Sequence, residues 1–191
     1  MALTITLSRE LTVELIRLII AYYLMKYKRG ISTEILVKFL FLILYTDSDG
    51  QRLLDAPRIR LPEEFRIYLK GPFVPIEKLL ADTRGVLKGN DKYYVGNISK
   101  TYEEALKALE EEGLGDVAKY ALKIVDIFGE LEEEDIIRHT LNLLKLRDDF
   151  VKAMSFNMSL DAYLETVKKL KKIMESREVV DEEELYPELF K

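Results

Sequence analysis

The sequence predicts a mainly helical α+β fold that has a winged-helix-like core, a small β-hairpin wing and a C-terminal helical extension. Three observations lead to this prediction. Apolar residues recur at helical spacing before residue 46 and again after residue 100. Between these regions, residues 65–70 alternate apolar and polar side chains and stop at Gly71-Pro72. Residues 86–95 then form a hairpin pattern around the turn residues 89–91, as a wing requires.

Two helices are expected in the first 45 residues. Ser8 is a suitable N-cap for the first, which we expect to end near Gly30. Ser32 is a suitable N-cap for the second, whose residues from Ile35 onward leave almost no polar face. The second helix is therefore predicted to be central and buried on nearly all sides.

The segment after the second helix is predicted to be a loop. Thr46 to Gly50 is rich in turn-forming residues, and Pro57 and Pro62 disfavour a regular helix beyond it. The run Asp-Ser-Asp-Gly at 47–50 resembles part of a calcium-binding loop. It lacks the third ligand before the glycine and the glutamate at position twelve, so we interpret it as a turn.

The Gly-Pro tract is expected to fix the geometry between a strand and the helix that follows. Gly71 and Pro72 end the predicted strand 65–70, and Pro75 suits the first turn of a short helix over 75–84. We assign a structural role to Gly71, Pro72 and Pro75. The wing then follows at 86–95, where the turn length permits a bulged or three-residue loop.

The rest of the chain is predicted to be helical. Thr101 and Glu104 form a capping-box pattern for a helix that ends at Gly113, and Asp116 is the expected cap of the next helix, which ends at Gly129. Further helices are expected over 132–147 and from Ser159 or Asp161 onward, the last one rich in lysine. We divide the chain into a winged-helix-like core (1–100), a helical part packed on the same core (101–177) and an acidic tail (178–191), which is either mobile or a docking peptide.

Composition excludes several classes of function. The chain has 191 residues, 48% hydrophobic and 33% charged, which is typical of one folded globular domain. It has no cysteine and a single histidine, His139, so thiol chemistry, a His-based dyad and a two-histidine metal site are excluded within one chain. Glycine-rich phosphate loops and nucleophile elbows are also missing from the sequence. We therefore predict no cofactor, no metal, no catalytic residue and a structural role for His139.

Location and habitat follow from the same composition. The longest apolar runs, 15–25 and 35–45, are shorter than the roughly 20 residues of a membrane span. The N-terminus lacks the pattern of a secretory signal, so we expect a cytoplasmic protein that does not enter a membrane. The single glutamine and the abundance of Lys, Arg and Glu are typical of proteins from thermophiles.

Three tracts resemble the Panacea family, the SocA-like antitoxins, and related small winged-helix proteins of archaea and bacteria. They are the lysine-containing apolar helix at 34–42, the tract Leu-Lys-Gly-Pro-Phe-Val-Pro at 69–75, and Ile-Arg-His-Thr at 137–140. The chain departs from the family in having no tryptophan and in its final helix. The resemblance implies a non-enzymatic interaction or regulatory module.

An alternative hypothesis is a winged-helix transcription regulator that binds DNA with the 75–84 helix and the 86–95 wing. Residues 58–92 carry a charge of +3 and residues 103–135 a charge of −9. Glu77 and Asp82, on the predicted recognition helix, would repel phosphate. The candidate nucleic-acid contacts are Lys78, Thr83, Arg84, Lys88, Lys92 and Tyr93.

Aromatic residues favour protein contacts over DNA. The chain has 11 Tyr and 8 Phe, and tyrosine is enriched at protein interfaces because it buries a large ring and keeps a polar tip. The net charge of −5 disfavours binding to nucleic acid by the molecule as a whole. Our leading prediction is therefore an antitoxin-like or adaptor protein that binds a protein partner or itself, as a homodimer.

Overall fold

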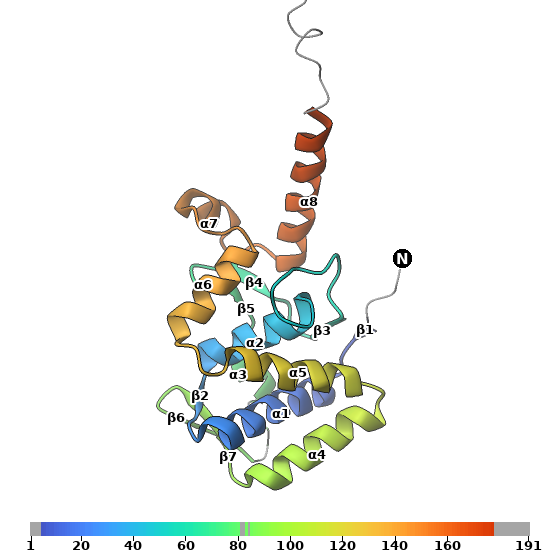
Figure 1. The fold of residues 1–191 in the computed structure, drawn as a ribbon, viewed down its shortest axis with the longest axis vertical. Helices are drawn as coiled ribbons and strands as arrows, with labels where there is room; N and C mark the ends of the chain where they lie inside the picture. Colours follow the sequence, from blue (N-terminus) through green and yellow to red (C-terminus); the bar gives the residue numbers. More distant parts are fainter. Residues whose placement is uncertain (1–4, 81–82, 84, 178–191) are drawn as a thin grey trace, which may run out of the picture.

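The computed structural model describes residues 5–80, 83 and 85–177, and it confirms the mainly helical α+β class (Figure 1). The described helices are α1 (Arg9–Tyr27), α2 (Thr33–Tyr45), α3 (Ile76–Leu80), α4 (Ile98–Glu111), α5 (Gly115–Phe128), α6 (Glu133–Leu143), α7 (Asp149–Ser155) and α8 (Leu160–Arg177). The described strands are β1 (Ile5–Thr6), β2 (Ile31–Ser32), β3 (Ile59–Arg60), β4 (Arg66–Tyr68), β5 (Gly71–Phe73), β6 (Val86–Gly89) and β7 (Lys92–Val95). The predicted acidic tail, 178–191, lies outside the described residues.

Helix α2 is the centre of the core, as predicted. Every residue from Ile35 to Tyr45 is buried, and α1, α5 and α6 pack around the helix. The hydroxyl of Ser32 accepts a hydrogen bond from the backbone N–H of Ile35 at 3.2 Å, which confirms the predicted N-cap. The other predicted N-cap in this region, Ser8 on α1, is confirmed by the same kind of bond from Leu11.

One hydrophobic core joins the two predicted parts of the chain. Buried residues of α4 and α5, such as Leu109 and Ile124, belong to the same cluster as those of α1 and α2. The predicted boundary at residue 100 falls inside α4, which begins at Ile98.

The predicted capping box at Thr101 is wrong, because Asn97 is the N-cap and Thr101 is buried within the helix. Likewise, Asp116 lies in the first turn of α5 and is not its cap.

The wing hairpin is present, with a shorter turn than expected. Strands β6 and β7 are antiparallel, and β2 pairs with β7 to give a three-stranded sheet in the order β2-β7-β6. Asn90 and Asp91 form a two-residue turn with φ values of 50° and 58°, the left-handed pair that suits a tight hairpin. The chain order is α1-β2-α2-β3-β4-β5-α3-β6-β7, and the winged-helix assignment stays a prediction.

Two predicted elements around the Gly-Pro tract need correction. The strand predicted over 65–70 was expected to end at Gly71-Pro72. Instead, Gly71–Phe73 forms a second strand, β5, which pairs antiparallel with β4 and places Pro72 opposite Ile67. The short helix that follows, α3, is described only over Ile76–Leu80, and of its predicted extension residues 81, 82 and 84 lie outside the described part of the chain.

The later helices also differ from the prediction. The helix expected over 132–147 ends at Leu143, and a separate helix, α7, follows it. Asp148 caps α7 by accepting hydrogen bonds from the backbone N–H groups of Phe150 and Val151, at 2.8 and 3.2 Å. None of the helices in the described ranges combines the length and the apolar character needed to cross a membrane.

Candidate protein-interaction surface

A buried lysine attaches the β4–β5 hairpin to the central helix. Lys38 lies on α2 with a side chain that is only 1% exposed. Its Nζ donates a hydrogen bond to the carbonyl oxygen of Pro72 at 3.0 Å and lies 2.5 Å from Oε1 of Glu34, one turn earlier on the helix. Burial lowers the pKa of Lys38, and the Glu34 carboxylate opposes that change. Strand β5 is thus attached to α2 by a charged side chain from the core.

Glycine at position 71 is favoured by its backbone conformation, while a Cβ there would make only ordinary contacts with α6. Gly71 has a φ of +94°, which side chains rarely adopt, and a Cβ placed on it would lie 3.4 Å from Leu141 and 3.5 Å from the hydroxyl of Thr140. Pro72 is buried beside it, and Pro75 is half-buried at the start of the next segment. The structural role assigned to Gly71, Pro72 and Pro75 stays a prediction, although Gly71 and Pro72 lie within β5 and do not end a strand.

The segment after α7 completes the hairpin on its other edge. The backbone N–H of Asn157 donates to the carbonyl of Ile67 at 2.7 Å, and the N–H of Ile67 donates to the carbonyl of Met158 at 2.9 Å. The Tyr68 ring then packs edge-on against Phe73 and Phe156, with centroid distances of 5.6 and 5.4 Å. The hairpin and α7 therefore pack together as one unit.

This unit presents apolar side chains to solvent. Leu69 at the hairpin tip is 68% exposed, Phe150 on α7 is 73% exposed, and Met154 lies one turn along from Phe150 and is also exposed. A groove of about 490 Å³ opens beside the tip. The residues that line the groove are Glu34, Lys38, Tyr68, Leu69, Lys70, Gly71, Phe73 and Phe156. We call the set Tyr68, Leu69, Phe73, Phe150, Met154 and Phe156 the hairpin–α7 surface.

The hairpin–α7 surface combines exposed apolar side chains with charged groups that are already paired. Clustered exposed apolar side chains on a folded protein mark sites of interaction. The charged groups at the groove are already engaged, Lys38 with Glu34 and Lys70 with Glu133 at 3.8 Å. Within the described residues, no group of three or more His, Cys, Asp or Glu side chains could hold a metal ion.

The predicted DNA-contacting residues are only partly available at the surface. Tyr93 is buried against the core, which removes it from the candidate contacts. Lys88 pairs with Glu77 at 3.5 Å, so part of its charge is compensated. Lys78 and Lys92 are exposed and Thr83 is half-buried, while Arg84 lies outside the described residues.

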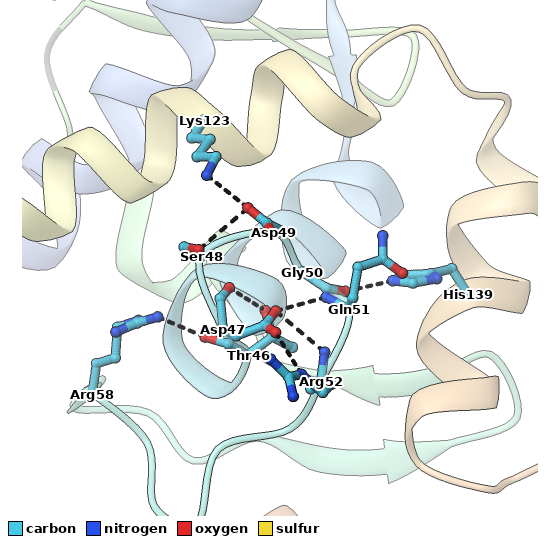
Figure 2. Close-up of polar contacts among 10 residues, drawn as sticks. All are labelled: Thr46, Asp47, Ser48, Asp49, Gly50, Gln51, Arg52, Arg58, Lys123 and His139. Atoms are coloured by element: carbon cyan, nitrogen blue, oxygen red, sulfur yellow. Dashed lines mark hydrogen bonds and ion pairs between the residues drawn. The ribbon is translucent and has the colours of Figure 1, made fainter.

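The loop after α2 is the turn that the sequence predicted (Figure 2). Oδ1 of Asp47 accepts hydrogen bonds from the backbone N–H groups of Gln51 and Arg52 at 2.8 and 3.2 Å. Asp49 pairs with Lys123 on α5 at 2.6 Å. The two carboxylates therefore close the loop and attach it to α5, which explains them without a calcium ion.

His139 attaches the same loop to α6, as Figure 2 shows. Its Nε2 lies 2.6 Å from the carbonyl oxygen of Gly50 and donates a hydrogen bond to it, and its ring packs on Phe128 with a centroid distance of 4.9 Å. These contacts link the end of α2 to α5 and α6. His139 thus holds the loop at Gly50 against α5 and α6.

Sequence reasoning missed the α7 part of the surface. Phe150 and Met154 are four residues apart and follow the capping residue Asp148, a pattern that a short helix would produce. Their exposure, in contrast, depends on how the hairpin packs beside α7, and the spacing of residues in the sequence does not predict it. No family model, curated protein or solved structure matches this chain, so the surface is interpreted from its geometry alone.

Proposed function

We propose that this protein is a non-enzymatic interaction module, an antitoxin-like or adaptor protein, that binds a protein partner through the hairpin–α7 surface. The observation that carries the proposal is an apolar groove beside the exposed Leu69, on a hairpin that Lys38 attaches to α2. Phe150 and Met154 are also exposed, on α7, the helix that ends just before the groove residue Phe156. A partner that offers apolar side chains to this groove fits the chemistry.

The energetics favour such a partner. Burial of a leucine or phenylalanine side chain contributes about 1.5–3 kcal/mol, so a few of these residues supply most of a micromolar affinity. The Lys38–Pro72 contact and the Asn157–Ile67 pairing keep the hairpin in one conformation before binding. Less conformational entropy is then lost on association.

The resemblance to the Panacea family supports the same proposal. Its most specific tract, residues 69–75, builds the tip and second strand of this hairpin. The lysine of the resembling helix, Lys38, donates a hydrogen bond to Pro72 in β5. Both tracts therefore contribute to the proposed binding surface or to its support.

The test is capture from a lysate of the native host with surface variants of the full chain. Wild-type protein should retain a partner that the double variant Leu69→Asp/Phe150→Asp loses, because two charges in the contact remove its apolar burial. Leu87→Asp is the matched control: Leu87 is an exposed leucine on the wing, at β6, and its substitution should leave capture unchanged. Equal capture by all three proteins would reject the proposal.

DNA binding remains the alternative because Lys88 and Lys92 are exposed on the β6–β7 hairpin. That hypothesis requires salt-dependent retention of DNA that weakens when Lys78, Lys88 and Lys92 are replaced by Ala. The observed pairing of Lys88 with Glu77 and the burial of Tyr93 favour the opposite outcome. We expect no retention of DNA at low salt, and retention that the alanine variant abolishes would establish the alternative.

A further inference from the structure

The second half of helix α8 is a basic surface that also exposes apolar side chains, and it projects away from the body of the protein (Figure 1). Residues 168–177 carry five basic side chains and one acidic side chain, which gives a net charge of +4. Leu170 and Met174 in this half are 55% and 65% exposed. Leu160 and Tyr163, at the start of the helix, are instead buried against the body.

A groove of about 440 Å³ lies on this half of α8. Lys145, in the loop after α6, lines the groove together with apolar and charged residues of the helix. Lys171 pairs with Glu175 at 3.6 Å, but both side chains are more than half exposed, so the pair contributes little. The residues that line the groove are Lys145, Val167, Leu170, Lys171, Met174 and Glu175. This lining suits a short segment in which carboxylates stand beside apolar side chains.

The segment that follows α8 in the sequence has this chemistry. Residues 178–191, which lie outside the described part of the chain, have six acidic side chains and one lysine, a net charge of −5. The whole chain also has a net charge of −5, so residues 1–177 are neutral overall. Glu-Leu-Tyr at 184–186 and Glu-Leu-Phe at 188–190 each place a carboxylate beside two apolar side chains.

The connection between α8 and these two triplets is long enough to reach the groove. Val167, the groove residue of α8 farthest from the end of the helix, lies about 15 Å along the helix axis from Arg177. Residues 178–183 span up to about 20 Å when extended. The triplets can therefore lie beside any of the groove residues on α8.

We propose that residues 184–190 of the same chain dock in the α8 groove, with their apolar side chains on Leu170 and Met174 and their carboxylates near Lys145 and Lys171. Attachment through a short connection gives the segment an effective concentration on the order of millimolar, so that a contact too weak for separate molecules is occupied within one chain. A second copy of α8 fits less well, because two halves of charge +4 would repel each other. The proposal goes beyond the proposed function, since the groove shares no residue with the hairpin–α7 surface.

The test uses cysteines, which the natural chain lacks, in full-length chains. Lys171→Cys/Lys191→Cys combines a cysteine in the groove lining with one directly after the second triplet. Lys172→Cys/Lys191→Cys is the matched control, because Lys172 is the next residue, is also exposed and is not among the groove residues. In glutathione buffer the intramolecular disulfide of the first chain should show an effective concentration about tenfold higher than that of the control.

The same pair of chains tests what holds the segment in the groove. Leu185→Ser/Leu189→Ser, added to both, should remove the difference because the docked apolar side chains are lost. Sodium chloride at about 1 M should reduce the difference by screening the charges. Equal effective concentrations in the two parent chains would overturn the proposal. Disulfides that form mainly between chains would assign the groove to a second copy and would also overturn it.

Discussion

Replacement of Lys38 by Met is expected to lower the free energy of unfolding by about 3 kcal/mol, because one partner of a buried ion pair is lost. The change leaves the Glu34 carboxylate without its cation and the Pro72 carbonyl without its donor. For a chain of this length the midpoint of thermal unfolding should fall by about 6–12 °C. Circular dichroism during heating at pH 7 measures the effect.

A second substitution separates the ion pair from packing. Lys38→Met combined with Glu34→Leu removes the unpaired carboxylate, so the double variant should regain more than half of the lost stability. If the Lys38→Met variant were as stable as the wild type, the hairpin would be held by other contacts. Equal loss in the single and double variants would assign the effect to the Pro72 hydrogen bond and to packing.

The contribution of Lys38 to the free energy of unfolding depends on pH. Burial lowers the pKa of Lys38 in the folded chain below its usual value of 10.5, which applies when the chain is unfolded. Between those two pKa values the unfolded chain binds more protons, so the free energy of unfolding contributed by this group rises with pH. The stability difference between the wild type and Lys38→Met should therefore widen as the pH approaches 10.5, as urea unfolding at pH 8 and 10 would show.

Gly50→Ala is expected to cost about 3 kcal/mol of folding free energy, from backbone strain and overpacking together. Gly50 has a φ of +69°, and a Cβ there would lie 2.6 Å from the Phe128 ring and 3.1 Å from Ile124. The loop that Asp47 closes and His139 holds cannot move away without loss of those contacts. Chemical denaturation of the purified variant measures the loss.

The control for this variant is Gly89→Ala in the wing. A Cβ at Gly89 meets no atom within 4 Å, and its φ lies outside the left-handed region. Its substitution should change stability by no more than about 0.5 kcal/mol. Similar losses for Gly50→Ala and Gly89→Ala would mean that the close packing of the loop against α5 does not limit stability.

Elements whose pattern is local were predictable from the sequence. The burial of α2 follows from a run of apolar residues from Ile35 to Tyr45, and its start follows from the hydroxyl of Ser32. The wing hairpin follows from the residues that flank the turn at 89–91, although its two-residue turn at Asn90 and Asp91 is shorter than predicted. These features depend on residues within a few positions of one another.

Features that depend on distant segments were not predictable. Gly71-Pro72 was expected to end a strand, but the carbonyl of Pro72 meets Lys38 and the chain turns back to pair with β4. Tyr93 was expected on the surface of the wing, but its side chain is buried in the core, on a strand that packs against α1. The exposure of Phe150 likewise arises from the placement of α7, which spacing alone does not report.

Amide hydrogen exchange of the full chain, with and without the partner captured from the host, tests the central claim most directly. The hairpin at 66–73 and the segment at 149–156 should become protected on binding, because the partner covers the hairpin–α7 surface. The wing at 86–95 should exchange at the same rate in both samples. Protection confined to the wing, with none at 66–73 or 149–156, would contradict the account.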